Sequence, residues 1–282
     1  MPTPRPNAPN LLVAGVVVCA FLVIDFITPL VWETNEEWIM AVALGICIGQ
    51  INLIATWAAL APGNAALRLP WAMLLGVLMW YAIVLGCRVA IGHYRLEDAV
   101  FLGIILLADI IATQIPLWIA RWKFRWRLIS PGTSADEAVE GPFQFYLWHL
   151  FVGMFFVSVA LAPARMVLPP GDAWSFRIDH ELPVLLPAVI LCNLVITIPC
   201  IWGAFARREK IGAIVIGWPF YCAILTGIEL AVLIAILGPP GGQTGEIYWV
   251  FYLLNLSQCI TVFGALLIFR AIGFQLIRAP KP

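Results

Sequence analysis

Charged residues are scarce in this sequence. Lys, Arg, Asp and Glu make up 11% of the 282 residues, whereas a typical soluble domain carries about 25%. So few charges do not cover a water-facing surface of this size, and lipid must therefore cover much of the outside. The 16 basic and 16 acidic residues also balance, which argues against a global attraction to nucleic acid or to an acidic partner.

The sequence also lacks the motifs that carry common chemistry. None of the seven cysteines forms a C-x-x-C pair, and all lie in apolar stretches, so we interpret them as packing residues. There is no H-E-x-x-H, G-x-S-x-G, phosphate-binding loop or dinucleotide fingerprint. We predict a protein that is not an enzyme and that binds no cofactor or metal. The alternative is an outer metal site formed by His93, Glu97 and His180.

Long apolar stretches fill nearly all of the chain. A helix needs about 20 apolar residues to cross the ~30 Å hydrocarbon core of a bilayer. The stretches do not alternate as barrel strands do, so we expect α-helices, whose backbone groups need no partner from lipid. We predict an all-α integral membrane protein with eight transmembrane helices at 11–32, 38–60, 69–91, 99–120, 143–167, 182–205, 211–237 and 247–269.

Basic residues predict the orientation of these helices. If the N-terminus lies in the cytoplasm, twelve of the 16 Lys and Arg residues fall on the cytoplasmic side and four fall outside. This bias favours cytoplasmic N- and C-termini. Residues 1–10 contain four prolines and are predicted to be a disordered cytoplasmic tail.

A short run at 121–127 alternates cations with aromatic residues. Rings at headgroup depth and cations on anionic lipid are typical of an interfacial anchor. We predict contacts with anionic lipid and no binding of nucleic acid; the cations are Arg121, Lys123, Arg125 and Arg127.

An internal duplication is indicated when the chain is aligned with itself, because 52–91 lies over 193–232 without a gap. Ten of the forty positions are identical, whereas about four are expected when membrane spans draw on few residue types. Chance similarity between apolar segments is the alternative. We predict two parallel four-helix halves, 11–127 and 143–282, joined by a cytoplasmic linker at 128–142.

Polar residues recur near the middle of four predicted helices. In three of them an Asn or Asp is followed four residues later by Thr, which puts both side chains on one helix face. We expect these groups to turn away from lipid. Two interpretations stay open: hydrogen bonds between helices, worth about 0.6 kcal/mol each, or a cavity that binds or passes a solute. The candidate mid-membrane site comprises Asn52, Thr56, Asp109, Thr113, Asn193, Thr197 and Asn255.

Acidic residues inside the predicted spans are expected only where they have a structural or functional role, because burying each charge costs roughly 2.5–3.5 kcal/mol. Asp109 has no cation at its depth, so we expect either a neutral carboxyl bonded to a neighbouring helix or a role in a proton-coupled step. Near the outer surface we predict a neutral charge cluster, which serves either as structural ion pairs or as a gate. Its members are Asp25, Arg88, Arg165 and Glu229.

Two stretches resemble a known group of proteins. I-G-Q-I-N-L-I-A-T-W-A-A-L-A-P-G at 48–63, followed by R-L-P at 68–70, resembles a stretch in uncharacterised multi-pass membrane proteins of planctomycete bacteria. F-Q-F-Y-L-W-H-L at 143–150 is similar to the F-Q-F-S-L-R-x-L-L opening of hydrophobic helices in those proteomes, with Tyr146 and Trp148 in place of Ser and Arg. The resemblance implies a bacterial inner-membrane protein and no particular activity, so no catalytic residue is inferred from it.

Hydrogen bonding between packed helices is sufficient to explain the polar residues in the predicted spans. We therefore predict a non-enzymatic membrane component. The alternative is a small-solute or proton-coupled transporter whose polar site lies at mid-membrane between the two halves.

Overall fold

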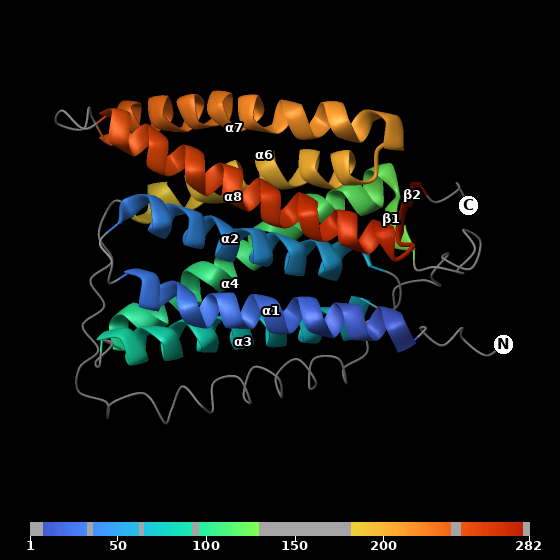
Figure 1. Cartoon of the computed structure of the whole chain (residues 1–282), viewed down its shortest axis with the longest axis horizontal. Helices are drawn as coiled ribbons and strands as arrows, with labels where there is room; N and C mark the ends of the chain where they lie inside the picture. Colours follow the sequence, from blue (N-terminus) through green and yellow to red (C-terminus); the bar gives the residue numbers. More distant parts are fainter. Residues whose placement is uncertain are drawn as a thin grey trace.

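The structure is a computed structural model that describes residues 8–32, 36–61, 65–91, 96–129, 182–237 and 244–278. Long α-helices run roughly side by side in this part of the chain (Figure 1). They are α1 (Ala8–Trp32), α2 (Glu37–Leu60), α3 (Ala65–Ile91), α4 (Leu96–Ile119), α6 (Leu182–Ala204), α7 (Arg208–Leu237) and α8 (Thr244–Ala271). The predicted span at 143–167 lies outside the described residues.

Five helical segments in the described residues are long and apolar enough to cross a membrane. They are Glu37–Leu60, Arg68–Ala90, Leu102–Phe124, Arg208–Ala235 and Thr244–Ala271. Large apolar side chains face outward from them; Ile216 and Phe220 on α7, for example, are each 70% exposed. Apolar surface on this scale is unfavourable in water and ordinary in lipid, so the protein is a helical, membrane-embedded protein.

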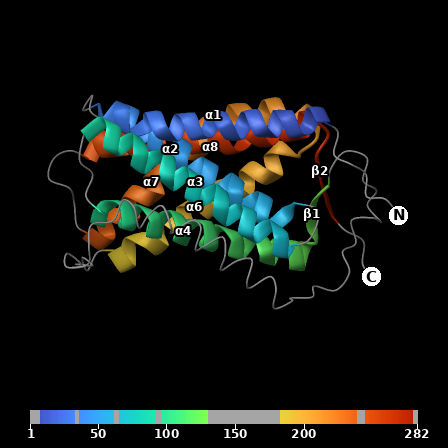
Figure 2. The same ribbon diagram turned by 90° about the horizontal axis from the view of Figure 1, so that it is seen from below.

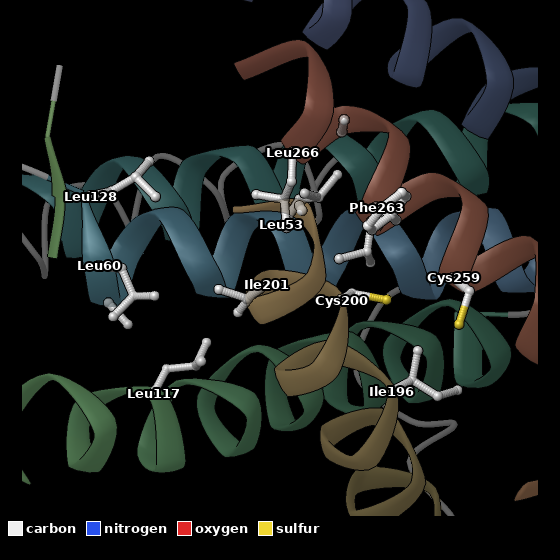
Figure 3. Packing of buried hydrophobic residues seen from close by; sticks show 14 of the residues in the cluster. Leu53, Leu60, Leu117, Leu128, Ile196, Cys200, Ile201, Cys259, Phe263 and Leu266 are labelled. Carbon is white, nitrogen blue, oxygen red and sulfur yellow. The ribbon is translucent and has the colours of Figure 1, made fainter. Parts of the chain in front are cut away.

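The core of the bundle lies where α2, α4, α6 and α8 meet. Figure 3 shows apolar side chains from these four helices packed against one another, among them Leu117 of α4, Ile196 and Ile201 of α6, and Phe263 of α8. A second apolar cluster joins α2 to α3 and α4 through Ile51, Met79 and other residues. α1 packs on α3, and α7 on α8, at the two sides of this centre (Figures 1 and 2).

The most extensive helix contact is between α2 and α8. It depends on Gly45 and Gly49, which form a G-x-x-x-G pair on one face of α2. A Cβ atom at Gly45 would overlap Leu254 O on α8, and a Cβ at Gly49 would lie 2.8 Å from the Thr261 side chain. Small residues at this spacing let two backbones approach closely in a membrane, so these glycines set the α2–α8 separation.

A small antiparallel sheet closes one end of the bundle (Figure 2). A π-helical turn, η1 (Ala120–Phe124), follows α4 and leads into β1 (Trp126–Ile129), while β2 (Gln275–Arg278) follows α8. Each helix changes direction into its strand through a residue with positive φ, Arg125 (59°) or Gly273 (99°). The apolar stretches predicted helices only; the first two residues of the proposed linker, 128 and 129, belong instead to β1.

Two arginines brace the same end of the bundle. Arg121 Nη1 donates to Ala59 O (2.7 Å) and Ala61 O (3.3 Å) at the end of α2. Arg270 Nη1 donates in the same way to Ala204 O (2.7 Å) and Ala206 O (2.6 Å) at the end of α6. Helix ends leave carbonyl groups without intrahelical partners, and each guanidinium satisfies two of them; we call these contacts the arginine braces.

Candidate functional site

A chain of side-chain hydrogen bonds crosses the bundle at the middle of its central helices. Asn193 Nδ2 on α6 donates to both carboxyl oxygens of Asp109 on α4, at 2.9 and 3.0 Å. Gln258 Nε2 on α8 donates to Asn193 Oδ1 at 3.0 Å. One amide side chain thus links three helices.

The fourth central helix, α2, joins this chain through Thr113 of α4. Thr113 Oγ1 lies 3.4 Å from Asn52 Oδ1 on α2 and 3.5 Å from Asp109 Oδ1 on α4. These distances are at the long limit for a hydroxyl donor, so the link to α2 is weaker than the amide bonds. We call Asn52, Asp109, Thr113, Asn193 and Gln258 the central polar cluster.

Burial isolates the central polar cluster from the outside of the bundle. Asn52, Thr113 and Gln258 are 0% exposed, and Asp109 and Asn193 are 3% exposed. The described residues provide Asp109 with amide and hydroxyl donors and with no cation. Polar groups at this depth must be satisfied inside the protein, and the cluster does this largely by pairing side chains of different helices.

Two predicted site residues lie beside the cluster rather than in it. Thr197 Oγ1 donates to the backbone carbonyl of Asn193 at 2.7 Å, within its own helix. Thr56, one turn after Asn52 on α2, is buried, and its hydroxyl has no hydrogen-bond partner among the described residues. The predicted Asn–Thr spacing therefore puts each threonine near its asparagine, but these two hydroxyls do not link helices.

Asn255 belongs to a second polar group, between α7 and α8. Its Nδ2 lies 3.0 Å from Thr226 Oγ1 and 2.6 Å from Glu229 Oε2. Asn255 precedes Gln258 by three residues on α8, so the second group is adjacent along this helix to the central polar cluster. Asn255 thus lies outside the central polar cluster, because its partners are on α7 rather than on the other central helices.

The predicted outer charge cluster is not assembled by the described residues. Asp25 on α1 accepts hydrogen bonds from Gln50 Nε2 (2.7 Å) and Cys47 Sγ (3.4 Å) of α2, whereas Glu229 lies across the bundle on α7 (Figure 1). Arg88 is exposed on α3, and Arg165 lies outside the described residues. Each buried carboxyl has an amide donor on the neighbouring helix, which satisfies an oxygen without the desolvation of a second charge.

Metal ligation has no support in the described residues, where no three His, Cys, Asp or Glu side chains come together. His93 and His180 of the alternative metal site lie outside the described residues, as does the side chain of Glu97.

Two features of the site were not among the residues of the predicted mid-membrane site. Gln258 carries one end of the amide chain, and its signal was present in the sequence as an amide in the middle of an apolar stretch. The Gly45–Gly49 pair, which brings α2 against α8, was readable as G-x-x-x-G.

The chain matches no protein-family model, no curated protein and no solved structure. The site alone therefore indicates the function. The central polar cluster offers amide, hydroxyl and carboxyl groups that pair with one another, which is an arrangement suited to holding helices together.

Proposed function

We propose that the protein is a non-enzymatic component of a bacterial inner membrane, in which the central polar cluster fixes the arrangement of α2, α4, α6 and α8. The observation that carries this proposal is the chain from Gln258 through Asn193 to Asp109, which joins three helices with bonds of 2.9 to 3.0 Å. Interhelical hydrogen bonds in membranes contribute about 0.6 kcal/mol each on average. Their main value is selectivity, because an alternative helix packing leaves these groups unpaired.

A small-solute or proton-coupled transporter is the second candidate. It is favoured by one observation: Asp109 is a buried carboxyl without a cation among the described residues, and buried ionisable groups in membrane helices often mark solute or proton pathways. In this function the amides of Asn52 and Asn193 would contact the solute when the four helices separate.

Flux measurements on the purified full chain in lipid vesicles distinguish the two candidates. We would trap a pH-sensitive dye, impose a proton gradient, and in parallel follow osmotic swelling in glycerol and in urea. A membrane component should give the rates of empty vesicles, both as wild type and as Asp109→Asn. Rates above those of empty vesicles that Asp109→Asn abolishes would replace the proposal with the transporter.

Both ends of the described chain lie on one side of the membrane in this proposal, and that side is the cytoplasm. α1 begins and β2 ends at the end of the bundle that carries the strand pair (Figure 1). Of the eleven Lys and Arg residues in the described ranges, ten lie at this end, and Arg88 near the end of α3 is the other one. Such a bias favours the cytoplasmic side.

The run at 121–127 serves as an anchor to anionic lipid in this proposal. Trp122 is 84% exposed, and Phe124 and Lys123 are exposed beside it, which suits a ring–cation pair at headgroup depth. Arg121 also has a structural role, because it forms one of the arginine braces and its guanidinium carbon lies 5.5 Å from the centroid of the Trp118 ring.

Two repeated four-helix halves are also proposed. The arginine braces support them, because Arg121 and Arg270 make equivalent contacts at the ends of α2 and α6, and both are followed by a strand. The self-alignment has a shift of 141 positions, whereas the two arginines lie 149 positions apart and their acceptors Ala59 and Ala204 lie 145 apart. The braces thus favour a repeated architecture, but with a register that differs from that of the alignment by four to eight positions. The similarity to planctomycete membrane proteins stays a prediction.

A further inference from the structure

Unpartnered polar atoms gather on the central helices. Asn52 Nδ2 and Thr56 Oγ1 on α2, and Gln258 Oε1 on α8, are buried and have no hydrogen-bond partner in the described part of the chain. Leaving a buried donor or acceptor unsatisfied costs roughly 1–3 kcal/mol. Three such groups therefore call for a partner that the described side chains do not supply.

Asn52 and Thr56 lie one helical turn apart on α2, and Gln258 lies on α8, which packs directly against α2. Asn52 and Gln258 are the two ends of the central polar cluster, which runs from one to the other through Thr113, Asp109 and Asn193. A Cβ at Gly49, one turn before Asn52, would lie 3.2 Å from the backbone oxygen of Gln258. The backbones of α2 and α8 are thus nearly in contact here, and this leaves room for a small partner only.

The hydrogen-bonding capacity of these atoms indicates the chemistry of that partner. Asn52 Nδ2 donates, Gln258 Oε1 accepts, and the Thr56 hydroxyl does both. Flipping either amide exchanges its donor and its acceptor but still leaves one atom of that amide unpartnered. The partner must therefore both donate and accept hydrogen bonds, which a monatomic ion does not do.

We propose that the central helices enclose bound water that hydrogen-bonds to Asn52, Thr56 and Gln258. Water is the smallest molecule with this capacity, and buried waters make about three hydrogen bonds to otherwise unsatisfied groups. The inference goes beyond the proposed function, since a structural component and a transporter could each hold such water. It adds a mobile proton donor and acceptor to the network that contains Asp109.

Water-edited solid-state NMR on the labelled full chain in lipid vesicles tests the proposal. Magnetisation that starts on water should reach the side-chain amides of Asn52 and Gln258 several-fold faster than it reaches the methyl groups of Ile51 and Val262. These two residues lie on the same helices and are as deeply buried, at 1% and 0% exposure. Transfer to both amides as slow as transfer to those methyls would overturn the proposal.

A pair of valine variants makes the test specific. Thr56→Val removes one proposed water partner at constant shape and should slow the transfer to the Asn52 amide several-fold. Thr197→Val is the matched control, because the Thr197 hydroxyl already bonds to the Asn193 carbonyl at 2.7 Å, and it should leave that transfer unchanged. If Thr56→Val leaves the Asn52 transfer at the wild-type rate, Thr56 is not a partner of the water and the proposed site is wrong.

Discussion

Replacing Asn193 with leucine should destabilise the bundle more than any neighbouring polar change of similar size. The variant removes the donor that Asp109 receives and the acceptor that Gln258 uses. Bonds to two partner residues, at about 0.6 kcal/mol for each partner, contribute ~1.2 kcal/mol. The stranded groups add a penalty, so we expect a total loss of about 1–3 kcal/mol.

Reversible unfolding of the purified protein in mixed micelles, followed by circular dichroism of the helices, measures this loss. Thr197→Val is the control one turn away, because its hydroxyl bonds only to its own helix backbone; we expect a change within about 0.5 kcal/mol. A cycle that combines Asn193→Leu with Gln258→Leu should show coupling of about 0.5–1.7 kcal/mol, since each change removes the same bond. Equal stability of Asn193→Leu and Thr197→Val would refute the assignment of the cluster as the contact that fixes these helices.

Three further outcomes are expected. Gly45→Ala should lower the free energy of unfolding by about 1–3 kcal/mol in the same assay, because its new Cβ overlaps Leu254 O. Gly217→Ala is the control, because a Cβ there meets nothing within 4 Å, and it should be neutral or stabilising. Equal effects of the two variants would contradict the close α2–α8 approach. Arg270→Leu should speed backbone hydrogen exchange at the end of α6, because two carbonyl groups lose their charged donor; unchanged exchange would show that this arginine brace is dispensable. A membrane-permeable maleimide should label Cys19 faster than the five buried cysteines of the described residues, and mass spectrometry of the modified peptides measures the order.

Length and apolar content were sufficient to predict the helices of the described residues, because lipid allows few alternatives to a continuous hydrogen-bonded helix. The inward turn of Asn52, Asp109 and Asn193 follows from the same physics, since their side chains find no partner in hydrocarbon. The partners themselves were not predictable. Whether Asp109 pairs with Asn193 or with a distant arginine depends on which helices are neighbours, and one sequence contains little information about that.

The strand pair and the Asp25 contacts also depend on which elements are neighbours, and they were not predictable from the sequence for the same reason. Nothing in W-R-L-I at 126–129 marks it as a partner of Q-L-I-R at 275–278. The pairing arises because α4 and α8 end at the same end of the bundle (Figure 1). Asp25 was expected near arginines because it lies in the outer part of its helix. It instead bonds to Gln50, because α1 crosses α2 at that depth, and the crossing is a property of packing.

The pairing of β1 with β2 also bears on how the protein is made. β1 is translated long before β2, because α6, α7 and α8 all lie between the two strands in the chain. Its edge therefore has no strand to pair with while the intervening helices enter the bilayer, and the ribosome must deliver the second partner before this end of the bundle can close. Until then β1, which follows α1 to α4 in the chain, carries an unpaired backbone edge at this end of the bundle.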